Sequence, residues 1–196
     1  MRVFLSLLLF AIDALIFWTP PAPKLEPWIL RVYEVRQDAR ANQRCKPATP
    51  LVATVYSQLT VAADGSVVYR ESIACQGPVE DGPLGKWPAQ GNPNDIYSAQ
   101  LPASEFENLI SFLNTGEVKE LNSFLNAAPI TDNYEIRIRR DTEEQHISVT
   151  AFLPSHYELK QKPALTQLIC RAKKIAGRAL HSEEIPDYCK LNAVNH

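Results

Sequence analysis

The chain lacks an excess of either charge. Its 20 Lys and Arg residues nearly balance 22 Asp and Glu residues, and the net charge is -2. Nucleic acids are bound through clustered positive charge, so this balance argues against a nucleic-acid partner. Glycine is also scarce, with seven residues against fifteen prolines, while 45% of the chain is hydrophobic. This composition argues against a disordered chain and indicates a folded body with stiff connections.

Motifs for nucleophilic catalysis, nucleotide binding and zinc are also missing. The sequence contains no G-x-S-x-G turn and no catalytic cysteine signature, which disfavours a hydrolase of the triad kind. It contains neither G-x-x-x-x-G-K nor G-x-G-x-x-G, so nucleotide binding through those loops is set aside. The sequence also lacks the closely spaced C-x-x-C or H-x-x-x-H pair that is typical of a tetrahedral zinc site. We therefore expect no cofactor and no metal.

The N-terminal segment has the pattern of an export signal. Met1 and Arg2 precede an apolar run that extends from Val3 to Trp18 and contains one charge, Asp13. This pattern predicts a signal peptide over residues 1–18, with a short uncleaved anchor as the alternative. Residues 19–27 are rich in proline and form a predicted semi-rigid spacer. We expect an extracytoplasmic protein that is secreted, periplasmic or anchored at the outer face of the membrane. It would contact the membrane only through residues 1–18, if these are not cleaved.

Four cysteines follow the predicted leader. An even number in an exported protein favours disulfides, although sequence leaves three connectivities open. Cys45 and Cys75 flank a predicted hairpin, whereas Cys170 lies in a predicted helix and Cys189 in the segment behind it. The sequential pairing, Cys45 with Cys75 and Cys170 with Cys189, is therefore preferred.

Alternating and helical patterns predict an α+β fold. Asp64 and Gly65 form a tight turn between two strand-like segments, and charged residues near 141 separate two others. Ser104 and Glu107 have the spacing of a capping box, which predicts a helix start there and an end at Gly116. A short helical pattern follows, and a long amphipathic helix is opened by Pro163. The predicted strands are 28–36, 51–62, 66–73, 134–139 and 146–150.

These elements predict one α+β domain over residues 28–180. We expect a four- to five-stranded antiparallel sheet packed on one face by two or three helices, with the other face wetted. Residues 181–196 form a polar C-terminal tail without a clear period.

Residues 76–100 combine glycine and proline and are predicted to form a long loop. Such loops are often binding elements, and Trp87 and Tyr97 are its candidate partner-binding residues. The alternative is that both rings fold back and cover the domain.

Candidate catalytic groups are few. His156 and the acidic turn of Asp141, Glu143 and Glu144 could serve a hydrolase as acid or base, but both are interpreted as solvated surface. The basic residues Arg171, Lys174 and Arg178 share one helical face, while Arg137 and Arg139 share one strand face. We interpret these as solvated charge as well, with a small basic surface as the alternative.

Three features together resemble a known arrangement: the hairpin at Asp64-Gly65, the L-P-x-S-E-F helix start at residues 101–106, and the strand after Asp132 that carries Tyr134, Ile136 and Ile138. Their order is similar to that in small uncharacterised bacterial envelope domains and, distantly, in emfourin-type protease inhibitors. The resemblance covers about residues 55–176 and transfers no functional residue.

We interpret the chain as a noncatalytic exported or envelope-associated domain that binds a macromolecule. Its partner would be an unidentified protein or envelope component, met through the long loop or the open sheet face. A protease inhibitor of the emfourin-like type is one alternative, implied only by the resemblance, and a hydrolase is another.

Overall fold

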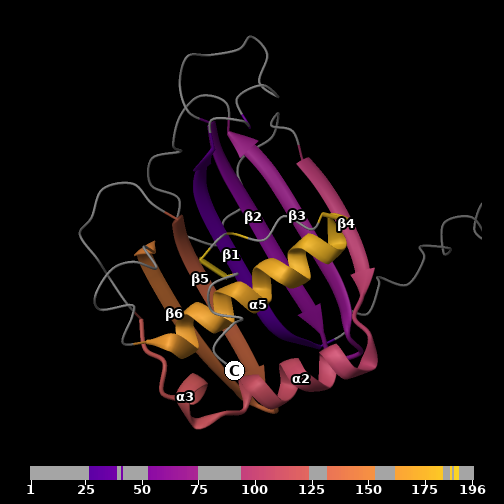
Figure 1. Ribbon diagram of the computed structural model, residues 1–196, viewed down its shortest axis with the longest axis vertical. Coiled ribbons are helices and arrows are strands. Elements are labelled where there is room, and N and C mark those ends of the chain that lie inside the picture. The colour runs from indigo at the N-terminus through magenta and orange to yellow at the C-terminus, as the bar shows by residue number, and fades with distance from the viewer. Residues whose placement is uncertain are drawn as a thin grey trace, which may run out of the picture.

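A computed structural model describes residues 27–38, 41, 53–74, 94–123, 132–152, 162–182, 186 and 188–189 (Figure 1). The predicted leader and the predicted spacer up to residue 26 lie outside these ranges, as do several residues singled out above, namely Cys45, Cys75, Trp87 and His156.

The described residues form an α+β fold around a six-stranded antiparallel sheet, in the order β4-β3-β2-β1-β5-β6. The predicted number of four to five strands is therefore wrong by at least one. Figure 1 shows the curved sheet with α5 running diagonally across one face. The strands are β1 (Trp28–Asp38), β2 (Ala53–Ala62), β3 (Ser66–Ala74), β4 (Asn94–Gln100), β5 (Asp132–Arg140) and β6 (Glu143–Phe152).

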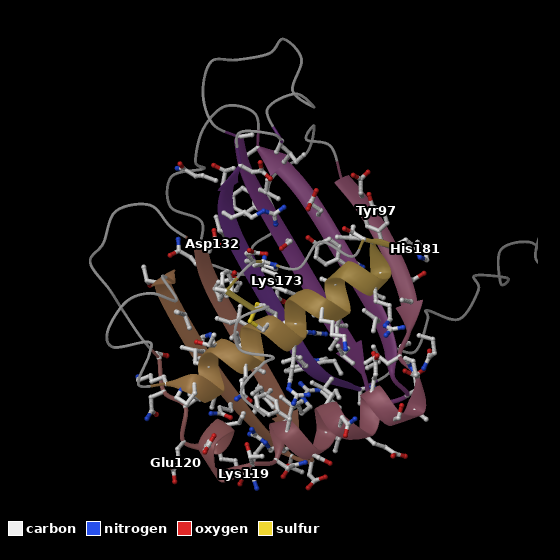
Figure 2. All side chains as sticks on the ribbon, viewed as in Figure 1. Tyr97, Lys119, Glu120, Asp132, Lys173 and His181 are labelled. Atoms are coloured by element: carbon white, nitrogen blue, oxygen red, sulfur yellow. A yellow bond between two sulfur atoms is a disulfide. The ribbon has the colours of Figure 1, made fainter. Side chains whose placement is uncertain are left out.

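The additional strand is β4, which lies inside the stretch predicted to be a loop. The last proline of that stretch is Pro93, and the residues after it pair with β3 without a break in register. Tyr97 therefore belongs to an edge strand and not to an irregular loop. Its half-buried side chain packs against the core, and its ring centroid lies 6.4 Å from that of Tyr69 (Figure 2).

Both predicted hairpins are confirmed. Gly65 occupies the β2–β3 turn with a φ of +81°, a backbone conformation that glycine adopts without steric cost. The β5–β6 turn places the non-glycine residue Asp141 at a φ of +49°. Asp is among the few residue types that tolerate this region.

Three helices lie in the described part of the chain: α2 (Ala103–Leu113), α3 (Gly116–Lys119) and α5 (Pro163–Ala179). The predicted capping box is wrong, because Pro102 is the N-cap of α2 and Ser104 lies within the helix. Gly116 does not end this helix but begins α3, whose N-cap Thr115 accepts a hydrogen bond from the Val118 amide. The start of α5 at Pro163 is confirmed.

The core lies between the sheet and α5. Ten of the 17 residues of α5 are buried, and they recur at intervals of three and four, as expected of an amphipathic helix that covers a sheet. In the strands, successive side chains point to opposite faces of the sheet, so alternate residues face this helix. Fully buried side chains from the two layers include Leu30, Ile136, Ile138, Ile147, Leu165, Leu168 and Ile169.

Two polar side chains of the last hairpin fix the ends of α2 and α3. Arg140 donates through Nε and Nη2 to the Leu113 carbonyl, at 2.9 and 2.6 Å. Gln145 donates through Nε2 to the carbonyls of Val118 and Leu121, at 3.0 and 2.9 Å. The Val118 carbonyl also accepts from the Leu121 amide at 3.2 Å. The hairpin thus supplies donors to carbonyls at the helix ends, where intrahelical partners run out, and attaches both helices to the sheet.

Replacement of Gly65 by alanine tests the turn. A Cβ atom at this position would lie 3.0 Å from Gln100 Nε2 and would force alanine into a positive φ. We expect Gly65→Ala to reduce the free energy of unfolding by at least about 1 kcal/mol, measured by urea denaturation. Gly116→Ala is the control, since nothing lies within 4 Å of its added Cβ, and it should leave stability unchanged or increased. Equal effects of the two substitutions would contradict this account.

Candidate functional site: a buried polar network beneath α5

The most unusual feature of the core is a carboxylate in its centre. Along β1, Leu30 and Val32 face the helices, and the same alternation places Glu34 on that side. Only 5% of Glu34 is exposed. A buried carboxylate is costly unless it is paired and hydrogen-bonded, so its partners decide its state.

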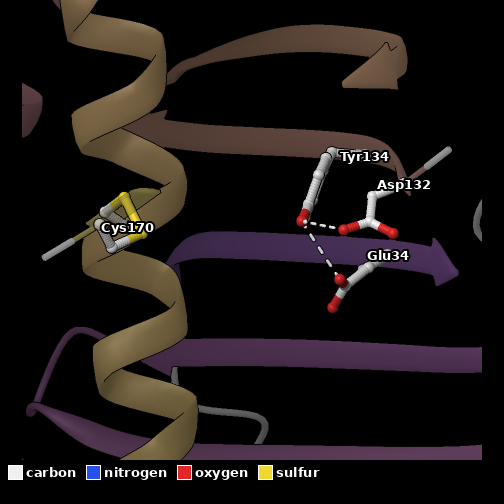
Figure 3. Close-up of a disulfide and its surroundings, with 5 residues drawn as sticks. Glu34, Asp132, Tyr134 and Cys170 are labelled. Carbon is white, nitrogen blue, oxygen red and sulfur yellow. Dashed lines mark hydrogen bonds between the residues drawn. A yellow bond between two sulfur atoms is a disulfide. The ribbon is translucent and has the colours of Figure 1, made fainter. Parts of the chain in front are cut away.

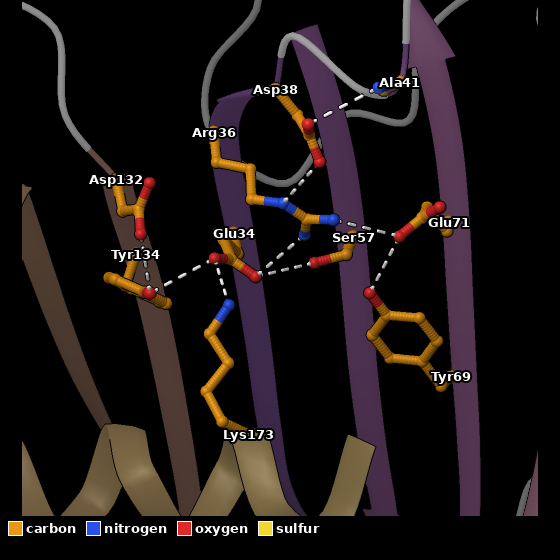
Figure 4. Close-up of polar contacts among 10 residues, drawn as sticks. All are labelled: Glu34, Arg36, Asp38, Ala41, Ser57, Tyr69, Glu71, Asp132, Tyr134 and Lys173. Atoms are coloured by element: carbon orange, nitrogen blue, oxygen red, sulfur yellow. Dashed lines mark hydrogen bonds and ion pairs between the residues drawn. The ribbon is translucent and has the colours of Figure 1, made fainter. Parts of the chain in front are cut away.

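Glu34 receives donors from three other elements. Lys173 of α5 forms an ion pair with Glu34 Oε1. The Tyr134 hydroxyl of β5 lies 3.1 Å from the same oxygen, and the Ser57 hydroxyl of β2 donates to Oε2 at 3.1 Å. Figure 4 shows that these groups converge on Glu34 from two neighbouring strands and the helix. The carboxylate is thus fully surrounded by donors.

Arg36 extends the network toward one end of the strands. Its guanidinium lies 3.5 Å from Glu34 Oε2, 3.3 Å from Glu71 Oε2 and 3.9 Å from Asp38 Oδ2 (Figure 4). The Tyr69 hydroxyl donates to Glu71 at 3.2 Å. One arginine therefore links carboxylates of β1 and β3 across the intervening strand β2.

A second carboxylate approaches the network from β5. Asp132 Oδ2 lies 3.4 Å from the Tyr134 hydroxyl, which stands between Asp132 and Glu34 (Figure 3). A hydroxyl has one proton and can donate to only one carboxylate at a time. Glu34 is the nearer of the two acceptors, so the Tyr134 proton is better placed for Glu34 than for Asp132.

The environment moves the pKa values of these groups in different directions. Burial alone would raise the pKa of Glu34, but the charges of Lys173 and Arg36 outweigh it and hold this pKa below its ordinary value. Burial, followed by the charge of Glu34, raises the pKa of Asp132. Burial also raises the pKa of Tyr69 to about 12 and that of Tyr134 well above its ordinary value.

These directions determine what the network can do chemically. At neutral pH Glu34 is ionised and both tyrosines keep their protons. A general base or acid works best with a pKa near the operating pH, and the pKa of Glu34 is shifted away from it. The adjoining cavity, bordered by Glu34, Tyr69, Tyr134 and Lys173, has about 20 Å³ of free space. That is room for about one water molecule, so the arrangement favours a structural role.

A disulfide holds the C-terminal segment against the same region. Cys170 of α5 is bonded to Cys189, with 5.4 Å between their Cα atoms (Figure 3). The predicted pairing of these two cysteines is confirmed. The neighbouring Tyr188 packs against the core, and its burial raises its pKa to about 12.

The open face of the sheet carries a second polar group. A bulge in β1 between Trp28 and Leu30 shifts the alternation, so that Trp28 lies on the face opposite the helices. Its ring is sandwiched between the guanidinium groups of Arg31 and Arg139, at 4.5 and 4.1 Å from the ring centroid. Arg31 also lies directly opposite Arg137 in the β1–β5 pair. Like charges in this position repel each other.

Carboxylates of the open face compensate only part of this charge. Glu135 pairs with Arg137 at 2.6 Å and with His146 at 3.0 Å, and only 4% of it is exposed. Glu144 pairs with Arg139 at 3.3 Å. Within the described part of the chain, the buried Nε of Arg31 has no hydrogen-bond acceptor.

The structure describes three of the four candidate catalytic residues. Asp141, Glu143 and Glu144 are exposed at the tip of the β5–β6 hairpin, far in the chain from Glu34, and His156 lies outside the described residues. The Glu34 network was not among the predicted sites. The sequence contains one signal for it, since Glu34 is a charged residue on the apolar side of an alternating strand.

The described ranges contain no group of three or more His, Cys, Asp or Glu side chains that could hold a metal ion. No helix in them is both long and apolar enough to cross a membrane. No protein-family model matches the chain, and no curated protein matches it in sequence.

Replacement of Glu34 by glutamine tests the network. This change leaves Lys173 without its carboxylate, and we expect the free energy of unfolding at pH 7 to fall by about 3 kcal/mol in urea denaturation. Because the pKa of Glu34 is lower in the folded state, its contribution is present above pH 4.5, the ordinary value, and is lost as the pH falls through the folded pKa. The difference between wild type and Glu34→Gln should therefore shrink in acid.

Two controls accompany this measurement. Asp132→Asn removes a carboxylate whose pKa is raised, so stability at pH 7 should be unchanged or increased. Glu144→Gln removes an exposed partner and should change stability by less than about 0.5 kcal/mol. A loss for Asp132→Asn as large as that for Glu34→Gln would contradict the proposed pKa directions.

Removal of the disulfide tests its contribution to stability. Cys170 and Cys189 are 19 positions apart, and a loop of about this length implies a stabilisation of about 3 kcal/mol. We expect the double substitution Cys170→Ser and Cys189→Ser to lower the free energy of unfolding by this amount under oxidising conditions. An unchanged value, measured with the other two cysteines retained, would show that the bridge does not constrain the unfolded chain.

Proposed function

We propose that this protein is a noncatalytic, exported binding module that docks an acidic partner protein on the open face of its sheet. The single observation that carries the proposal is Arg31, a cation stacked on Trp28, facing Arg137, with a buried Nε that has no acceptor in the described part of the chain. The side chain as a whole is partly exposed, so a carboxylate from a partner would pair with its guanidinium and compensate its charge.

The charge of the whole open face supports an acidic partner. Strand alternation places four arginines on this face and two glutamates, with His146 beside them. Arg70 is exposed on β3, next to the exposed Ile96 of the edge strand β4. An exposed apolar side chain among cations is compatible with a docking surface, and charge complementarity would guide the encounter. The four arginines are Arg31, Arg70, Arg137 and Arg139.

Export is part of this proposal. A structural disulfide such as Cys170–Cys189 persists in oxidising compartments and is rare in the cytosol. The apolar run at residues 3–18 provides a route out of the cytoplasm. The two features are independent of each other, since one lies in the first residues and the other joins α5 to the C-terminal segment.

Site-specific photo-crosslinking in the producing cell tests the docking face. A photoreactive residue at position 60, on the open face beside Arg31, should capture an acidic protein, identified by mass spectrometry. The same residue at position 119, on the exposed surface of α3, is the control and should not capture it. Capture from position 119 alone would contradict the proposal.

Charge reversal then measures the contribution of the face. Binding of the captured protein should weaken by at least about tenfold for Arg31→Glu and for Arg70→Glu, and by less than twofold for Lys119→Glu, measured by calorimetry. Arg70 is exposed, so its variant remains informative if Arg31→Glu fails to fold. Binding should also weaken as salt is added. Unchanged affinity in both Arg31→Glu and Arg70→Glu would overturn the assignment.

The alternative functions give different results in the same system. If the captured protein is a metalloprotease that loses activity on binding, the protein is an inhibitor of the emfourin-like type. Turnover of an ester or peptide substrate by the purified protein would instead indicate a hydrolase. Substitution of His156 and of Glu143 would then show which candidate group takes part.

A further inference from the structure

A cleft separates α2 from α5 on the face of the sheet opposite the proposed docking surface. Its volume is about 110 Å³, several times that of the cavity beside Glu34. Its lining combines apolar side chains with side chains that carry hydrogen-bond donors. The residues that line it include Leu101, Leu109, Ile175, Asn108, Arg171 and Lys174.

Arg171 is the unusual member of this cleft. Its guanidinium lies 4.4 Å from the centre of the Phe112 ring, so one face of the guanidinium is covered. Among the described residues it forms no ion pair, in contrast to Arg36 and Arg137, which are each held by carboxylates. Burial lowers its pKa, and no neighbouring carboxylate opposes this.

The nearby carboxylate is already engaged elsewhere. Glu105 of α2 lies at the cleft, where it pairs with Arg178 at 2.5 Å and with Lys174 at 3.8 Å. One negative charge therefore stands against three positive charges, counting Arg171. The donors of Arg171 are left for a ligand, because a partly desolvated cation is stabilised by an anion that reaches it.

We propose that this cleft binds a small aliphatic monocarboxylate. The planar guanidinium, which lies over the Phe112 ring, carries paired N–H donors that match the two oxygens of a carboxylate. Lys174 and Asn108 add a charge and an amide to the lining, while Leu109 and Ile175 provide apolar contacts for a short carbon chain. Glu105 disfavours a ligand with a second negative charge, such as phosphate.

The proposal is independent of the docking function. The cleft is formed by two helices, whereas the docking face is formed by strands on the other side of the sheet. Failure of one assignment therefore leaves the other unaffected.

Titration of the purified, oxidised protein with butyrate tests the cleft, followed by amide chemical shifts in nuclear magnetic resonance spectra. We expect saturable shifts in α2 and α5 with a dissociation constant in the millimolar range, on the order of 1 mM. Butyramide, which has the same shape without the charge, should bind at least tenfold more weakly, and inorganic phosphate should also bind more weakly. Stronger binding of phosphate than of butyrate would overturn the assignment to a monocarboxylate.

Variants locate the binding group. Arg171→Met keeps an extended side chain over Phe112 and should weaken butyrate binding at least tenfold, whereas Arg171→Lys should have an intermediate effect because it lacks the planar fork. Asn108→Asp adds a negative charge at an exposed position, so it should fold and should also weaken binding. Arg70→Met, on the opposite face, is the control and should bind as wild type does. Absence of saturable shifts up to about 20 mM butyrate, or unchanged binding in both Arg171→Met and Asn108→Asp, would refute the proposal.

Discussion

The ion pair between Glu34 and Lys173 joins β1, a central strand of the sheet, to α5, across 139 positions of the chain. Because Glu34 is buried, the sheet and the helix are held in the one relative position that brings an ammonium to the carboxylate. Hydroxyls from β2 and β5 complete the surroundings of Glu34, so three adjacent strands and a helix depend on one side chain. The disulfide between Cys170 and Cys189 attaches the C-terminal segment to α5, the helix that carries Lys173.

With α5 held in this way, the two faces of the sheet acquire different characters. The helix side buries the apolar residues of both hairpins and leaves a cleft where α2 and α5 separate. The open side carries stacked arginines whose charge is partly compensated by Glu135 and Glu144. These two features support the binding role that we propose.

Local patterns predicted much of the fold. The turn at Gly65, the alternation in β5 and β6 and the stripe of α5 each depend on neighbouring residues, and all three were recognised. The strand β4 was missed because glycines and prolines precede it, and its pairing with β3 is a contact that no local pattern reports. The capping box failed because the chain begins α2 directly after Pro102, which places Ser104 inside the helix.

The sequence by itself determined the class of fold, the two hairpins, the last helix and an even set of cysteines suited to an oxidising compartment, because spacing along the chain is enough for these. Only the tertiary structure decided which charges meet. Arg171 and Arg31 look like ordinary surface cations in the sequence, and both prove to be partly buried without a carboxylate partner in the described residues. The environment of these charges depends on residues distant in the chain, here Phe112 for Arg171 and Arg137 for Arg31.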